Sequence, residues 1–186
     1  MDEAFWAAYT DRQPDTNQAE SLRNILKPWL SSIHSALEVG CNRGDNLGAF
    51  DPWIAYGVEP NRHARKKALG WGFPVLDAKA DNLPFGDDRF DLVFTVGVLI
   101  HISPEDLDAS LREIHRVAKK FILAIEYDAP DEEPVDYRGV RAGIWKRPYG
   151  DEYMYRFMNL DLMASGDAPG FDGCKFWLFE KVWITW

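Results

Sequence analysis

The fold is decided by residues 36–47, ALEVGCNRGDNL. In this stretch a short apolar run containing an acid is followed by two glycines, Gly40 and Gly44. This order predicts a buried strand, a tight turn and then a helix, the arrangement that forms a nucleotide-sized site at the carboxyl end of the first strand of a parallel α/β sheet. Glycine allows φ > 0 and, having no Cβ, lets the backbone approach a ligand closely. The stretch therefore predicts a cofactor site.

The spacing differs from two common nucleotide motifs. A dinucleotide fingerprint needs a third glycine near position 45, where this chain has Asp45. A Walker loop needs Gly-Lys-Ser/Thr after Gly44, and that sequence is absent. A second apolar run, 54–59, ends in Glu59, and an acid there can accept hydrogen bonds from both hydroxyls of a ribose. These signals predict a nucleoside ligand and leave an NAD site as an alternative.

Length and composition limit the class of protein. With 186 residues, 46% of them hydrophobic and 14% aromatic, the chain is expected to form a single domain over 1–186. A net charge of −9 disfavours nucleic acid as a bulk partner and an anionic membrane surface. No signal peptide or long apolar span is evident, so we expect a cytoplasmic protein, either monomer or homodimer. Cys41 and Cys174 are too few for a disulfide scaffold or a zinc site, and no metal is expected.

The rest of the chain alternates between helical and strand patterns. Helices are expected over 2–12, 17–30, 45–50, 61–70 and 104–118, with a short helical turn at 97–101. Strands are expected over 36–40, 54–59, 74–77, 90–95 and 120–126, and an antiparallel strand over 174–181. Ser103 is a predicted N-cap and Pro104 suits the first turn of its helix. Such alternation predicts a mostly parallel sheet with helices on both faces.

Two segments flank this alternation. The first, 1–30, is predicted to be a helical cap, because Phe5, Trp6 and Tyr9 fall at helical spacing. The second, 128–156, begins acidic and continues basic and aromatic, so it is too apolar for a solvated linker. We expect it to be an ordered lid over the substrate.

Four motifs follow in order: 38–46, then Glu59, then 81–85, then 90–102. Together they resemble class I S-adenosylmethionine-dependent methyltransferases. Further residues are similar to the pseudaminic acid biosynthesis-associated methylases, which are linked with surface-sugar pathways: Phe5, Trp6, Tyr9, Arg12, 97–104, 125–127, 137–139, 146–147 and 177–181. The resemblance implies a Rossmann-like fold with a mostly parallel seven-stranded sheet and an antiparallel C-terminal strand. It also implies S-adenosyl-L-methionine as cofactor and S-adenosyl-L-homocysteine as product.

The resemblance also implies which residues hold the cofactor. Glu38 would face its ammonium, Glu59 would hold its ribose, and the backbone carbonyls of Val96 and Gly97 would face its amino group. The implied cofactor set is Trp6, Tyr9, Arg12, Glu38, Gly40, Cys41, Asn42, Gly44, Glu59, Pro60, Ala80, Asp81, Val96, Gly97 and Ile100.

Asn42 and the adenine contact differ from the rest of this set. Asn42 stands where the general motif has glycine, and asparagine is among the residues that best tolerate the left-handed region. For adenine, two registers are open: Lys79 with Ala80, where Asp81 is nearby, or Asp77 with Ala78 two residues earlier. We favour the register with Ala80.

Residues at the ends of the fourth and fifth strands are candidates for catalysis. His101, Glu126 and Tyr127 could accept the proton that an amine or hydroxyl acceptor must lose. For His101 the alternative is a packed core residue, because its neighbours in sequence are apolar.

The lid supplies the candidates for acceptor binding, Tyr137, Arg138, Lys146 and Arg147. Guanidinium groups bind carboxylate or phosphate through paired hydrogen bonds, so this set suits a small anionic, sugar-related acceptor. The alternative is that the basic residues pair with the acids of 128–136. The sequence thus predicts methyl transfer to an O or N atom of such an acceptor. Another small metabolite as acceptor, or a non-catalytic S-adenosylmethionine-binding protein, are the alternatives.

Overall fold

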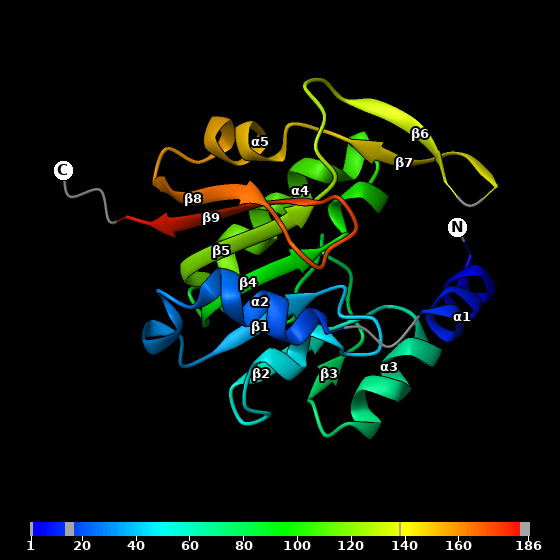
Figure 1. Ribbon diagram of the computed structural model, residues 1–186, viewed down its shortest axis with the longest axis horizontal. Coiled ribbons are helices and arrows are strands. Elements are labelled where there is room, and N and C mark those ends of the chain that lie inside the picture. Colours follow the sequence, from blue (N-terminus) through cyan, green and yellow to red (C-terminus); the bar gives the residue numbers. More distant parts are fainter. Residues whose placement is uncertain (1, 14–16, 138, 183–186) are drawn as a thin grey trace.

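A twisted seven-stranded sheet forms the centre of the computed structural model, which describes residues 2–13, 17–137 and 139–182 apart from the side chains of 141 and 142 (Figure 1). Its strands are, in the order β3-β2-β1-β4-β5-β9-β8, Val75–Leu76, Ala55–Val58, Ala36–Val39, Phe90–Val96, Ala118–Glu126, Lys175–Lys181 and Leu160–Asp167. The pairings from β3 to β5 are parallel, and β9 is antiparallel to both of its neighbours. The predicted mostly parallel seven-stranded sheet with an antiparallel C-terminal strand is confirmed.

Helices cover both faces of this sheet. They are α1 (Glu3–Arg12), α2 (Gln18–Leu26), α3 (Arg62–Gly70), α4 (Pro104–Val117) and α5 (Tyr149–Arg156), with 3-10 turns η1 (Leu30–Ser32), η2 (Asn46–Ala49) and η3 (Leu99–His101). Side chains alternate across β4, so that Val93 packs in one core with Leu111 of α4, and Phe94 packs in the other with Leu22 of α2. Burying one such side chain contributes about 1.5–3 kcal/mol.

The helix α4 forms as the sequence predicts. The Ser103 side chain accepts a hydrogen bond from the Asp106 backbone N–H at 3.3 Å, and Pro104 occupies the first turn. Leu107, Leu111 and Ile114 are buried on the face that meets the sheet. The helix therefore holds the turn that precedes it, 97–103, at a fixed place on the sheet edge.

Three expectations need correction. The helix predicted over 45–50 is only the 3-10 turn η2, and the helix predicted over 17–30 ends at Leu26 because Pro28 lacks the N–H that an α-helix needs. The strand β8 was not predicted from the pattern of residues. The segment 128–156 is no loop, since it contains the antiparallel hairpin β6 (Glu133–Tyr137) and β7 (Val140–Lys146), followed by α5.

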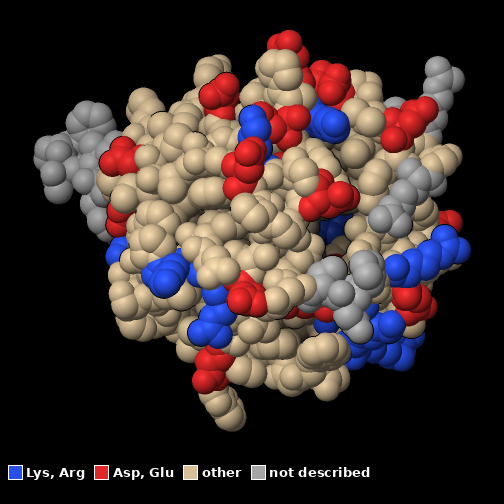
Figure 2. Space-filling view, in the orientation of Figure 1, with Lys and Arg blue, Asp and Glu red and all other residues tan. Residues whose placement is uncertain are grey.

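The carboxyl ends of β1, β2 and β4 meet at one edge of the sheet, which is the right-hand side of Figure 1. Both α1 and the β6–β7 hairpin lie on that side. Acidic and basic side chains are interspersed over the face seen in Figure 2. Within the described parts of the chain, no helix has the length and apolar character needed to cross a membrane.

Candidate functional site

The turn after β1 is built on residues in the left-handed region. Gly40, Asn42 and Gly44 have φ of 73°, 47° and 89°, so the prediction that Asn42 tolerates this conformation is confirmed. A Cβ on Gly40 would lie 2.7 Å from the Val98 side chain, so glycine lets the loops after β1 and β4 come together.

Gly44 has a packing role. A Cβ there would lie 3.2 Å from the Cβ of Ala68 in α3, and Gly44 is not on the wall of the cleft. Its missing side chain makes room for a helix, and its contact with the cofactor stays a prediction.

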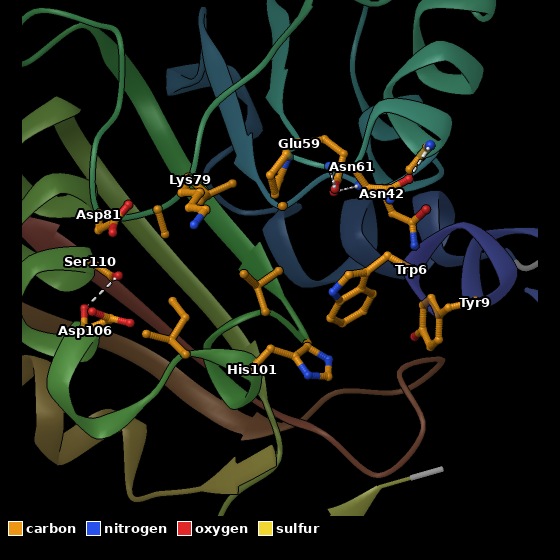
Figure 3. Close-up of a pocket in the computed structure, with 18 of the residues that line it drawn as sticks. Trp6, Tyr9, Asn42, Glu59, Asn61, Lys79, Asp81, His101, Asp106 and Ser110 are labelled. Carbon is orange, nitrogen blue, oxygen red and sulfur yellow. Dashed lines mark hydrogen bonds between the residues drawn. The ribbon is translucent and has the colours of Figure 1, made fainter. Parts of the chain in front are cut away.

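A cleft runs along the sheet edge where these loops meet (Figure 3). Its larger chamber has a volume of about 530 Å³ and its smaller chamber about 170 Å³. Both chambers are lined by Tyr9, Gly40, Asn42, Val96, Gly97 and His101. The larger chamber also takes in the predicted residues Trp6, Glu59, Pro60, Ala80 and Asp81, and the smaller takes in Glu38, Cys41, Ile100, Tyr127 and Tyr137.

Two buried carboxylates stand along this cleft. Glu59 accepts hydrogen bonds from the backbone N–H groups of Asn42 at 2.9 Å and Asn61 at 2.8 Å. Burial raises the pKa of Glu59, and these two hydrogen bonds partly oppose the rise. Glu38 accepts a hydrogen bond from the Asn46 side chain at 2.7 Å, and burial raises its pKa well above the usual value. The second oxygen of Glu38 is buried without a hydrogen-bond partner among the described residues, so it is available to a ligand donor.

The wall after β3 is made by the four residues 78–81. Asp77 is not in this wall, and its carboxylate instead forms an ion pair with Arg65 at 2.8 Å. The position of these residues favours the register with Ala80 over the register with Asp77.

One side of the cleft is closed by α1. The Trp6 ring meets the His101 ring edge-on at a centroid distance of 4.7 Å (Figure 3). The Thr10 hydroxyl donates to the Asn42 side chain at 2.8 Å, which ties this helix to the glycine-bearing turn. Arg12 is exposed and does not line the cleft, so its contact with the cofactor stays a prediction. At 100° per residue, Arg12 lies roughly 120° round the helix from Trp6.

Of the three catalytic candidates, only two reach the cleft. His101 lies between Trp6 and Tyr137, whose ring centroid is 5.5 Å away. Tyr127 lines the smaller chamber, donates its hydroxyl to Asp172 at 2.9 Å, and has its pKa raised by burial. Glu126 is fully buried and does not line the cleft, so its prediction as a catalytic residue is wrong.

Some of the predicted acceptor residues lie at the cleft and others do not. Tyr137 lines the smaller chamber, and the Lys146 ammonium lies 5.9 Å from the ring centroid of Tyr127. Arg147 is fully buried and its guanidinium is bonded to Glu132 and to backbone carbonyls, so its prediction as a substrate residue is wrong. Arg138 lies outside the described residues.

Several polar residues of the cleft were not predicted. They are Thr10, Asn61, Ser103, Asp106 and Ser110 in the larger chamber and Gln13, Gln18, Asp45, Asn46 and Asp172 in the smaller one, joined by the aromatic residue Trp145. Thr10 follows Trp6 by one helical turn, and Asn61 follows Glu59 by two residues, so these two could have been found from residues already chosen. Asp172 comes from the β8–β9 connection, for which the sequence offered no signal.

Residues 37–121 match the family model described as a methyltransferase domain. The matched region covers 85 of the 186 residues. Two of the solved structures that share the fold of this chain contain bound S-adenosylhomocysteine. A search of curated proteins finds no match.

The solved structures resemble this chain in fold at low sequence identity. The PH0226 protein of Pyrococcus horikoshii has a TM-score of 0.75 at 14% identity, over 94% of this chain and 98% of that one. The 1,6-didemethyltoxoflavin-N1-methyltransferase of Burkholderia thailandensis, bound to S-adenosylhomocysteine, has a TM-score of 0.71 at 16% identity, over 90% and 80%. Phosphoethanolamine N-methyltransferase 1 of Haemonchus contortus has a TM-score of 0.70 at 16% identity, over 98% of this chain and 48% of that one.

Proposed function

We propose that the cleft at the carboxyl edge of the sheet binds S-adenosylmethionine and transfers its methyl group to an O or N atom of a small acceptor. The observation that carries this proposal is the position of Glu59 and Glu38 in two chambers that share six lining residues. Glu59 is held by two backbone N–H groups and still has lone pairs for the hydroxyls of a ribose. The second oxygen of Glu38 would accept a hydrogen bond from the ammonium of the methionine part.

The remaining cofactor contacts follow from this placement. The adenine would lie against the wall at 78–81, and the backbone of Val96 and Gly97 would face the amino group. Trp6 and Tyr9 would cover the cofactor from α1. Each of these residues lines the cleft, and together they would bury a ligand of nucleoside size.

Methyl transfer requires little covalent chemistry from the protein. The cofactor supplies an activated sulfonium methyl, and the chain has to align acceptor and methyl and to exclude water. His101 is the residue we propose for accepting the proton of an amine or hydroxyl, because its ring lies in both chambers and its usual pKa suits that role. Tyr127 would orient the acceptor, since its own proton is given to Asp172.

For the acceptor we propose a small, sugar-related molecule that carries an anionic group. It is supported by the resemblance of the sequence and by Lys146, whose ammonium lies beside Tyr127 of the smaller chamber. Arg147 does not support an anionic acceptor, because its guanidinium is buried and donates to a backbone carbonyl of the protein. A second candidate is another small metabolite, which is favoured by the names of two similar structures, both nitrogen methyltransferases of small molecules.

Calorimetry and a methyl-transfer assay test the proposal together. We expect the protein to bind S-adenosylhomocysteine and not NADH, and to transfer a labelled methyl group to a member of a panel of sugar acids, nucleotide sugars and small amines. Binding of NADH in preference to S-adenosylhomocysteine would overturn the cofactor assignment. Binding of S-adenosylhomocysteine with no transfer to any acceptor would favour a non-catalytic binding protein.

A further inference from the structure

The turn from Gly97 to Ile102 forms the floor between the two chambers of the cleft. Gly97 has φ of 60°, and its backbone N–H donates to the carbonyl of Ile125 at 2.8 Å. Beyond it, the η3 turn brings His101 to the wall of both chambers. The place of the His101 ring therefore depends on what holds the backbone of this short turn.

On one side the turn is held by Glu126. Its side chain is fully buried, and one carboxylate oxygen accepts hydrogen bonds from the backbone N–H groups of Val98 and Leu99, both at 3.1 Å. Burying a carboxylate is costly unless its oxygens are hydrogen-bonded. Glu126 therefore has a specific task at this position, to satisfy the N–H groups of Val98 and Leu99 in the turn.

On the other side the turn is held by Arg147. Its guanidinium is fully buried and donates to the carbonyl of Leu99 at 3.2 Å and to the carbonyl of Ile102 at 3.0 Å. A third nitrogen of the same group forms an ion pair with Glu132 at 2.5 Å. The backbone of Leu99 is thus hydrogen-bonded on both sides. Its N–H donates to Glu126, and its carbonyl accepts from Arg147.

Arg147 also belongs to the segment that carries the lid. It follows β7 directly, and β7 packs against η3. The carbonyl of Arg147 accepts hydrogen bonds from the backbone N–H groups of Ala129 and Tyr149, which fixes the residue against the chain that leaves β5. Two residues earlier in β7, Trp145 lines the larger chamber. One short stretch therefore contacts both the cleft and the turn that carries His101.

We propose that Arg147 and Glu126 are positioning residues, which hold the 97–102 turn from its two sides and couple the β6–β7 hairpin to the place of His101 in the cleft. This rests on the proposed function in one respect, since the position of the turn matters for catalysis only where the cleft binds the cofactor. Neither residue touches the ligand. Each acts through the backbone of the turn.

The His101 ring offers a direct readout that needs no ligand. The chain has four histidines, and the His101 ring lies edge-on to the rings of both Trp6 and Tyr137. These aromatic rings shift the NMR resonances of the His101 imidazole away from those of a solvated histidine. A loosened turn will move the His101 signals toward the solvated values and leave those of His34, His63 and His115 in place.

Three variants and two controls test the proposal. Arg147→Met removes the hydrogen bonds to the carbonyls of Leu99 and Ile102. Glu126→Met removes the acceptor of the Val98 and Leu99 N–H groups, whereas Glu126→Gln keeps a carbonyl oxygen as acceptor. Arg112→Met is the matched control for lost charge, because Arg112 is exposed and pairs with Asp108 on the surface of α4. Ile122→Val, in the core strand β5, controls for a loss of stability without a change in the turn.

At temperatures below their melting temperatures, both Met variants are expected to show shifted His101 signals. We also expect them to bind S-adenosylhomocysteine about tenfold more weakly, which corresponds to ~1.4 kcal/mol. Glu126→Gln should restore the wild-type signals, and both controls should match the wild type. If Arg147→Met does not fold, Arg147→Lys is measured in its place and should show a smaller shift in the same direction, since lysine has one nitrogen for two carbonyls.

Met variants that melt earlier but keep the wild-type His101 signals and affinity would overturn the proposal and leave the two residues a role in stability alone. The same result would follow if Glu126→Gln shifted the signals as much as Glu126→Met. Failure of the proposed function is recognised separately, as wild-type protein that does not bind S-adenosylhomocysteine while the His101 signals still respond to the variants.

Discussion

Glu59 illustrates how one side chain can serve both the fold and the ligand. Its carboxylate already joins the turn after β1 to the start of α3 through the N–H groups of Asn42 and Asn61. We expect Glu59→Gln to weaken S-adenosylhomocysteine by about 1.5–3 kcal/mol, the range for a hydrogen bond to a charged group. Calorimetry measures the loss, with Asp161→Asn on β8 as the control for a lost surface charge. Unchanged affinity would show that Glu59 serves the turn alone.

Gly44, in contrast to Glu59, serves the packing of the fold. At φ of 89° a β-branched residue is strained, and its Cβ would also press on Ala68. We expect Gly44→Val to lower the free energy of unfolding by about 2–4 kcal/mol, from backbone strain and overpacking together. The folded fraction should bind S-adenosylhomocysteine normally.

The cost of the contact with α3 can be separated from the cost of the backbone. Gly72 has φ of 90° with open space around it, so Gly72→Ala measures the cost of the dihedral angle alone. Chemical denaturation of Gly44→Ala and Gly72→Ala should show the larger loss for Gly44. Equal losses would mean that Ala68 yields and that packing on α3 costs nothing.

At the scale of elements, α1 contacts the rest of the molecule through polar groups and through the Trp6 ring, which packs against His101. The Asn61 side chain donates to the carbonyl of Glu3 at 3.0 Å, and Asp11 pairs with Lys67 at 2.6 Å. Because exposed ion pairs contribute little, Trp6 should supply most of what this helix gives to the ligand. We expect Trp6→Ala to weaken S-adenosylhomocysteine by about 1–2 kcal/mol. Tyr155→Ala, which truncates an aromatic ring that is 88% exposed, should leave the affinity unchanged.

The elements around the parallel sheet were predictable because each has a local signal. The β1 turn was readable from Gly40 and Asn42, and α4 from Ser103 and its apolar face. The strand β8 was not, because most of its side chains are exposed at the edge of the sheet and no buried alternation marks it. Arg147 was misread for a related reason. A buried arginine and a ligand-binding arginine look alike until the carbonyls of Leu99 and Ile102 are placed beside it.

At the scale of the whole molecule, buried carboxylates make stability depend on pH. Burial raises the pKa of Glu126 from 4.5 to about 7. Burial, followed by the charge of Glu126, raises the pKa of the neighbouring Tyr149, Tyr153 and Cys174. Between these two pH values the folded chain binds a proton at Glu126 that the unfolded chain has released. The contribution of this residue is therefore fully present below pH 4.5 and is lost as the pH rises through 7.

Glu126→Gln isolates this contribution, because glutamine does not titrate and keeps an acceptor for the Val98 and Leu99 N–H groups. His115 acts in the opposite direction, since burial lowers its pKa and the folded chain then gains stability as the pH rises. The informative quantity is thus the difference between variant and wild type in urea unfolding at pH 5, 6, 7 and 8. We expect the variant to gain on the wild type as the pH rises, by on the order of 1–3 kcal/mol across the range. A difference that stays constant with pH would mean that Glu126 titrates near its unfolded pKa, and that the bonds to the turn fully offset its burial.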